Sequence, residues 1–243
     1  MNELTPTSAV GGSLESATSP AAPIPAPPAG VFAALSELLK HPFWSARRVQ
    51  LDGPLAPSLR ILAAGLVCFG AYGAAAGFFQ GGHQIGVAAL KAPLIALSSL
   101  LLCLPSFFVF GLLSGADLTL RRTVGLLSVF FGMLGLLLVG LLPIGWLFSF
   151  SSSSLLFATW LHVVAWAVAL WFGWRLLKLA FPHTPTQRVS LLWTVLFAIV
   201  SFQMATILRP VLYRAEGQPL VEGAKLFFLE HLASLSSPDV IKK

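Results

Sequence analysis

The stretch that decides the fold runs from Leu90 to Leu113 and reads LKAPLIALSSLLLCLPSFFVFGLL. Lys91 is its only charged residue. A helix rises about 1.5 Å per residue, so a segment of this length can cross a hydrocarbon core of about 30 Å. We therefore expect this segment to be the central membrane helix of a bundle with several spans.

The composition of the whole chain indicates the same class. The 243 residues are 56% hydrophobic and only 10% charged, whereas a soluble domain carries about 25% charged residues. The mean hydropathy is +0.84, which predicts an integral membrane protein. The formal net charge of +6 does not indicate a nucleic-acid partner, because the basic residues stand at the ends of apolar runs, where they meet lipid head groups.

Five apolar segments are expected to span the bilayer and to form an all-α, polytopic membrane helix bundle. They cover residues 59–79, 90–113, 123–148, 155–177 and 189–207. Glycines, serines and prolines fill the breaks between them, which is typical of loops. The predicted organisation is a disordered Pro/Ala/Ser tail at 1–30, an amphipathic helix at 31–50, a five-helix transmembrane domain at 59–207 and an amphipathic C-terminal tail at 208–243.

The two amphipathic segments flank the predicted bundle. Residues 31–48 place apolar side chains on one helical face and end in aromatic and basic residues. Such a segment is either a helix that lies in the membrane interface or a short helix packed on the cytoplasmic end of the bundle. The tail after Pro210 also has one apolar helical face, and it predicts a second surface helix. Protein partners are expected to bind through these terminal segments.

Basic residues gather before the first span and in alternate loops, which predicts an orientation. They are Lys40, Arg47, Arg48, Arg60, Arg121, Arg122, Arg175, Lys178 and Arg188. By the positive-inside rule, the N-terminus is cytoplasmic. Five spans then place the C-terminus outside, although Arg209 and Arg214 argue against this. Either the rule is overruled there, or the fifth segment does not fully cross. Residues 1–30 show no cleavable signal peptide, so the first span is expected to act as an uncleaved signal.

Glycines recur at every fourth residue near the ends of two predicted spans. Gly73, Gly77 and Gly81 lie at the end of the first span, and Gly111 and Gly115 lie at the end of the second. Small residues at this spacing make a flat strip that another helix backbone can approach closely. The strip is either a face for a homo-oligomer or a packing face within one chain, and we favour internal packing.

Three prolines fall inside predicted spans and are expected to bend the helices: Pro93, Pro105 and Pro143. A proline has no N–H to donate, so each one frees a backbone carbonyl. That carbonyl either lines a cavity or is satisfied by packing.

Few polar residues lie within the predicted spans. His162 is an ionisable group in the fourth span, which makes it a candidate for a functional site. Lys91, His83 and Gln84 are predicted to lie on the same side of the membrane, so they are candidates for a polar pocket with His162. The alternatives are that His162 forms a hydrogen bond to a neighbouring helix and that Lys91 extends to the head groups.

The sequence offers little for catalysis. No Asp or Glu lies in any predicted span, which argues against a proton-coupled transporter. Nucleophile motifs such as GxSxG and HExxH are absent, and Cys68 and Cys103 do not have metal-binding spacing. We therefore expect no catalytic residue, no cofactor and no metal site, and two buried thiols that act as core residues.

Several short motifs carry a resemblance over roughly residues 60–180: Tyr72-Gly73, Lys91-Ala92-Pro93-Leu94, Leu104-Pro105-Ser106, Leu142-Pro143-Ile144 and Leu161-His162-Val163. The chain resembles a group of bacterial multi-pass proteins that are similar to the Yip1-type five-span family and are sometimes labelled as actin-binding WH2 proteins. The resemblance implies five spans, a cytoplasmic N-terminus and a bacterial inner membrane. The DLYGP-like motif of the GTPase-binding branch and an LKKT-like element are absent, so neither partner is carried over.

The sequence thus favours a non-catalytic membrane protein that organises or scaffolds a complex through its terminal segments. The alternative is a small transporter or permease-like component with a polar pocket around Lys91 and His162.

Overall fold

The computed structural model describes residues 30–51, 54–78, 84–151, 155–180 and 184–207. Within these ranges the chain forms seven helices and no strand, so the predicted all-α class is confirmed. The helices are α1 (Val31–Lys40), α2 (Pro42–Gln50), α3 (Leu55–Phe78), α4 (Gln84–Leu113), α5 (Leu120–Ser151), α6 (Leu155–Ala180) and α7 (Thr184–Ile207). The predicted tails at 1–29 and 208–243 lie outside the described residues.

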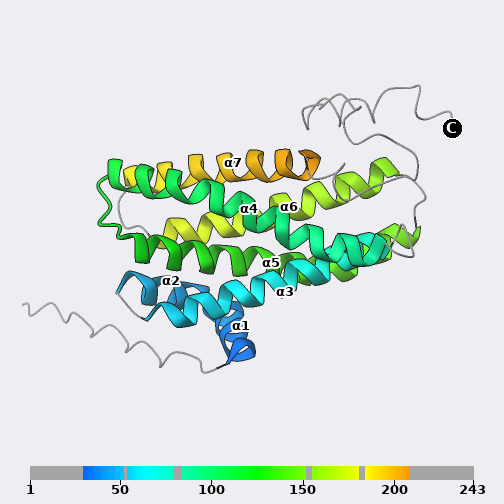
Figure 1. Ribbon diagram of the computed structural model, residues 1–243, viewed down its shortest axis with the longest axis horizontal. Helices are drawn as coiled ribbons and strands as arrows, with labels where there is room; N and C mark the ends of the chain where they lie inside the picture. The colour runs from blue at the N-terminus through cyan, green and yellow to red at the C-terminus, as the bar shows by residue number, and fades with distance from the viewer. Residues whose placement is uncertain (1–29, 52–53, 79–83, 152–154, 181–183, 208–243) are drawn as a thin grey trace, which may run out of the picture.

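Helices α3 to α7 are the five predicted spans, and each is long and apolar enough to cross a membrane. They lie side by side, and each runs antiparallel to the one before it in the chain (Figure 1). Most begin or end a few residues beyond the predicted limits, because the helix continues into the polar residues that flank each apolar run. Many leucines and valines of these helices are exposed on the outside of the bundle. The chain is therefore an integral membrane protein whose outer faces contact lipid.

The central helix is α5, not α4 as the sequence had indicated. In the most apolar stretch of α5, 61% of the residues are buried, against 39% or fewer in the other four spans. Leu101 and Leu102 of α4 are each 59% exposed, so one face of that helix meets lipid. The expectation was wrong because lipid tails are as apolar as leucine, and hydrophobicity alone does not separate a lipid-facing helix from a protein-facing one.

Three glycines let α3 and α5 approach each other closely. Gly65 of α3 lies opposite Gly132 and Gly135 of α5, and a Cβ atom added to Gly135 would lie 2.9 Å from the carbonyl oxygen of Gly65. A Cβ atom added to Gly132 would overlap the Ile61 side chain. These positions therefore favour glycine, because the two helices approach so closely that a larger residue would press on the facing helix.

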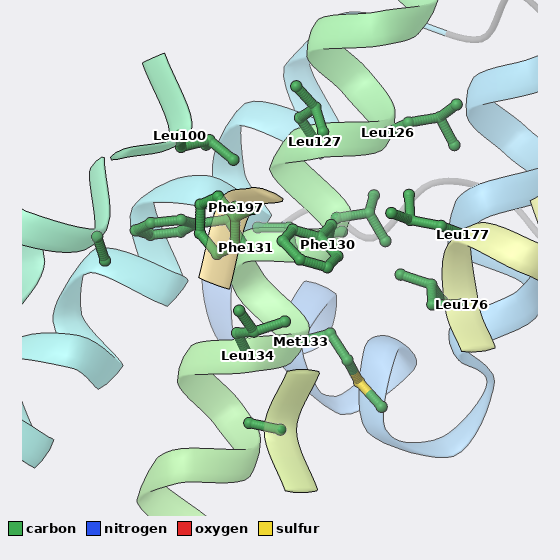
Figure 2. Close-up of a cluster of buried hydrophobic side chains, with 14 of the residues drawn as sticks. Leu100, Leu126, Leu127, Phe130, Phe131, Met133, Leu134, Leu176, Leu177 and Phe197 are labelled. Carbon is green, nitrogen blue, oxygen red and sulfur yellow. The ribbon is translucent and has the colours of Figure 1, made fainter. Parts of the chain in front are cut away.

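An aromatic cluster fills the space around α5. Phe130 of α5 packs edge-on against Trp193 and Phe197 of α7, with ring centroids 5.5 Å and 5.4 Å apart. On the other side of α5, Phe131 packs against Phe69 of α3 at 4.7 Å. Figure 2 shows that the buried side chains of α5 project in different directions around the helix axis. One helix thus supplies contacts to its neighbours on several sides.

A buried hydrogen bond joins α7 to α4. The indole Nε1–H of Trp193 donates to the backbone carbonyl oxygen of Cys103 over 2.9 Å. The Trp193 side chain is fully buried, and its ring also lies 4.8 Å from that of Phe107 in α4. The bond satisfies a polar group that would otherwise be costly to bury in an apolar surrounding.

The turn between α4 and α5 explains one of the predicted glycine pairs. Gly115 has a φ of +80° and ends α4 in a Schellman motif. Its N–H donates to the carbonyl of Leu112 over 3.0 Å, and the N–H of Ala116 donates to the carbonyl of Gly111 over 3.1 Å. Gly111 faces Leu118 in the following linker. This pair therefore belongs to a helix stop and not to a strip that packs against another span.

The predicted helix at 31–50 consists of two helices, which we call the N-terminal hairpin (α1 and α2). His41 separates them, and Pro42 begins α2. Proline is suited to the first turn of a helix but cannot continue one, so the single predicted helix breaks here. The hairpin packs on the bundle: α1 contacts α3 and α5, and α2 contacts α5 and α6.

The three prolines lie inside continuous helices. Pro93 and Pro105 are within α4, and Pro143 is within α5. Each removes the N–H that would bond to the carbonyl four residues earlier, yet the helix resumes after every proline. Packing by neighbouring helices is what permits this in a membrane protein.

We predict that Gly132→Ala destabilises the protein by about 1–3 kcal/mol, because the added methyl group overpacks the contact with Ile61. Gly140→Ala is the matched control on the same helix, since a Cβ atom there meets nothing within 4 Å. That control is expected to be neutral or slightly stabilising. Thermal unfolding in detergent, followed by tryptophan fluorescence, measures both. Equal midpoints for the two variants would contradict the close contact.

Candidate functional site

The most distinctive polar contact inside the bundle joins α3 to α6. The Tyr72 hydroxyl and Nδ1 of His162 lie 2.7 Å apart. The two rings meet edge-on, with centroids 5.6 Å apart and an interplanar angle of 88°. In a neutral imidazole one ring nitrogen accepts and the other carries the proton. When Tyr72 donates to Nδ1, the proton of the ring is therefore on Nε2.

This pair forms part of the wall of a cavity of about 130 Å³ between α3, α5 and α6. Apart from Tyr72 and His162, the wall is apolar. It consists of Ala75 and Ala76 from α3, Leu141, Leu142 and Ile144 from α5, and Leu161, Val164, Ala165 and Val168 from α6. The cavity is suited to an apolar group that carries a single hydrogen-bonding atom.

The cavity lies near the end of α3 and the beginning of α6. Tyr72 is six residues before the last residue of α3, which corresponds to about 9 Å along the helix. Arg121 and Arg122 stand at the start of α5, whereas the α5 residues of the cavity begin at Leu141. The cavity is therefore in the half of the bundle that is remote from these two arginines.

Part of the cavity wall also forms the outer surface of the bundle. Ile144 of α5 is 50% exposed, and Val164 of α6 is 55% exposed. In a membrane these side chains face lipid, so this part of the cavity wall borders the bilayer.

Of the four predicted pocket residues, the structure describes the side chains of His162 and Lys91. His162 lines the cavity, but Lys91 of α4 is not among the described residues that do so. Lys91 is half-buried and engages in an interaction of its own. His83 and the side chain of Gln84 lie outside the described residues. The alternative that His162 bonds to a neighbouring helix matches the contact with Tyr72.

Tyr72 is the site residue that sequence reasoning missed. A tyrosine within an apolar run needs a partner for its hydroxyl, which is a usable signal. The sequence does not show which of the other spans faces that hydroxyl, because the pairing of α3 with α6 depends on the whole bundle.

The predicted glycine strip of the first span is only partly described. Gly73 lies against the backbone of Ala88 and the side chain of Ala92, so it marks a close crossing of α3 and α4. Gly77 is buried within α3, and Gly81 lies outside the described residues.

The remaining candidates for chemistry are engaged in packing. Cys68 and Cys103 are free, buried thiols. Among the residues that the structure describes, no group of three or more His, Cys, Asp or Glu side chains is placed to hold a metal ion.

Comparison with protein-family models, with curated proteins and with solved structures finds no match for this chain.

We predict that Tyr72 and His162 are energetically coupled by about 0.6 kcal/mol, with an upper limit near 1.7 kcal/mol, the range measured for hydrogen bonds between membrane helices. A double-mutant cycle with Tyr72→Phe and His162→Leu measures this coupling as a difference in unfolding free energy. The control cycle combines Tyr72→Phe with Thr123→Val, at the opposite end of the bundle, and is expected to be additive. The hydrogen bond would be refuted by additive effects in both cycles.

Proposed function

We propose that this chain is a non-catalytic, Yip1-like protein of the bacterial inner membrane that organises a membrane complex, with its N-terminus in the cytoplasm. The observation that carries the proposal is the N-terminal hairpin, which is fixed to the bundle on one side and presents apolar and basic side chains on the other.

The inner side of the hairpin is well packed. Ala34 and Leu38 of α1 are fully buried, and Ala46 of α2 is 1% exposed. Val49 lies against Gly125 of α5, where a side chain at position 125 would collide with it. The hairpin therefore has a defined position on the bundle.

An ion pair fixes the two helices of the hairpin relative to each other. The guanidinium Nη1 of Arg48 lies 2.9 Å from Oε1 of Glu37, and the side chains are only 11% and 17% exposed. A buried pair of this kind adds little net stability, but the loss of one partner leaves an uncompensated charge. Its physical effect is to favour one arrangement of α1 against α2.

The outer side of the hairpin is suited to binding. Phe32 is 88% exposed and Leu39 is 64% exposed. Lys40, which follows Leu39 in α1, and Arg47 of α2 are also exposed. A large apolar side chain beside positive charge is typical of surfaces that bind an amphipathic segment of another protein.

Three buried hydroxyl groups within the spans form hydrogen bonds inside their own helices, as expected of residues with a structural role. Ser99 donates to the carbonyl of Ile95 over 2.8 Å, Ser128 to that of Val124 over 2.7 Å, and Thr194 to that of Ser190 over 2.8 Å. Such bonds satisfy the hydroxyl within its own helix.

The orientation in this proposal follows from the basic residues. Arg121 and Arg122 at the start of α5, Lys178 at the end of α6 and Arg188 at the start of α7 belong to the same end of the bundle (Figure 1). The positive-inside rule assigns that end, and the N-terminal hairpin beside it, to the cytoplasm.

The alternative, a small transporter or permease-like component that works through Lys91 and His162, has less support. Its cavity is apolar, and of the two named residues only His162 lines it.

We predict that Phe32→Ala combined with Leu39→Ala lowers the recovery of bound partner proteins about tenfold or more, because the two substitutions remove the exposed apolar side chains that would contact a partner. A tenfold loss corresponds to about 1.4 kcal/mol of binding free energy. Leu101→Ala combined with Leu102→Ala is the matched control, since both leucines are 59% exposed on α4. Affinity purification in mild detergent, with quantitative mass spectrometry, compares both variants with the parent chain. Partners that are retained by the hairpin variant would refute the proposal.

A further inference from the structure

The cavity beside Tyr72 and His162 has the size of one small ring. Its volume is about 130 Å³, and an apolar cavity of about 150 Å³ in a protein core is known to stay dry and to bind benzene. A six-membered ring therefore fits the space, whereas a fused polycyclic molecule does not.

The polar atoms of the cavity select for an accepting oxygen. A phenol O–H is a stronger donor than a neutral imidazole N–H, and the imidazole nitrogen is the stronger acceptor. We therefore assign Tyr72 as the donor to Nδ1 of His162, which leaves Nε2–H as a donor. The other nine residues of the wall have apolar side chains, so no lining Lys, Arg, Asp or Glu compensates the charge of an ionic ligand. A neutral molecule with a carbonyl oxygen matches this wall, because burying a lone charge in apolar surroundings is costly.

The route of entry selects for a molecule that is soluble in lipid. Ile144 of α5 and Val164 of α6 line the cavity and are half exposed to the region that lipid occupies. The side of the cavity that borders lipid is therefore the one that a membrane-dissolved molecule meets first.

We propose that this cavity binds the ring of a neutral, lipid-soluble carbonyl compound of the quinone class, which enters from the bilayer between α5 and α6 and accepts a hydrogen bond from Nε2–H of His162. The hydrocarbon tail of a lipid fits less well, because it offers no acceptor to the polar pair. No electron transfer is part of the proposal, and the site is independent of the partner surface on the N-terminal hairpin.

The test uses the full chain in lipid nanodiscs and two probes. The first is a benzoquinone that carries a decyl chain, and the second is decylbenzene, which has a six-membered ring of similar size and the same chain but no oxygen. Calorimetric titration gives the dissociation constants, and thermal unfolding gives the shift of the midpoint that a ligand specific for the native state produces. We expect the quinone to bind at least fivefold more tightly than decylbenzene, as one neutral hydrogen bond predicts.

Variants locate the site. Ala76→Leu fills the cavity and is expected to abolish the midpoint shift, whereas Ala71→Leu, at an exposed position one turn earlier on α3, is expected to keep it. His162→Leu is expected to weaken quinone binding about fivefold and to leave decylbenzene binding unchanged. His162→Gln retains an N–H donor and is expected to restore part of the affinity.

A photoreactive diazirine on the decyl chain gives a readout that does not depend on any variant folding. Labelling of peptides from α5 and α6, suppressed by an excess of unlabelled quinone, is the expected result. Equal affinity for the quinone and decylbenzene would assign the cavity to hydrocarbon chains and overturn the proposal. Labelling elsewhere, or an unchanged shift in a folded Ala76→Leu variant, would also overturn it.

Discussion

The contact between the backbones of α3 and α5 is the constraint on which the rest of this bundle depends. Within a bilayer, two apolar helices gain nothing by leaving lipid for each other, so close packing has to supply the attraction. Gly65, Gly132 and Gly135 provide it, since they let the two helices approach more closely than larger residues would allow. Large side chains of α5 pack beside this contact, against Phe69 of α3 and against Trp193 and Phe197 of α7.

Both of the proposed binding surfaces depend on the position of α5. The N-terminal hairpin packs where α5 has small residues: Leu38 lies near Gly132, and Val49 lies against Gly125. The cavity occurs farther along the same helix, near Pro143, where the wall of α3 is made of Ala75 and Ala76. Small residues of α5 thus allow the tight contact with the hairpin, whereas small residues of α3 leave the space that forms the cavity.

The number of spans was predictable from the sequence, because a long apolar run has few alternatives to crossing a membrane. The arrangement of those spans was not. The run from Leu90 to Leu113 is the most distinctive in the sequence, yet it forms a peripheral helix with a lipid-facing side. His162 stood out as an isolated ionisable residue, but its partner Tyr72 lies 90 residues away in the chain. The hydrophobic pattern of a sequence predicts which segments enter lipid, but it does not predict which faces of the helices pack against each other.

Oxidative cross-linking within native membranes tests the α3–α5 contact most directly. A Cβ atom added to Gly135 would lie 3.2 Å from Cβ of the native Cys68, close to the separation found in disulfides. In a Cys103→Ala background, Gly135→Cys is predicted to form an intramolecular disulfide with Cys68 on mild oxidation. Gly140→Cys, at an open position more than one turn farther along α5, is predicted to leave both thiols reduced. The account would be contradicted if the Gly135→Cys variant kept free thiols, or if the Gly140→Cys variant formed the disulfide instead.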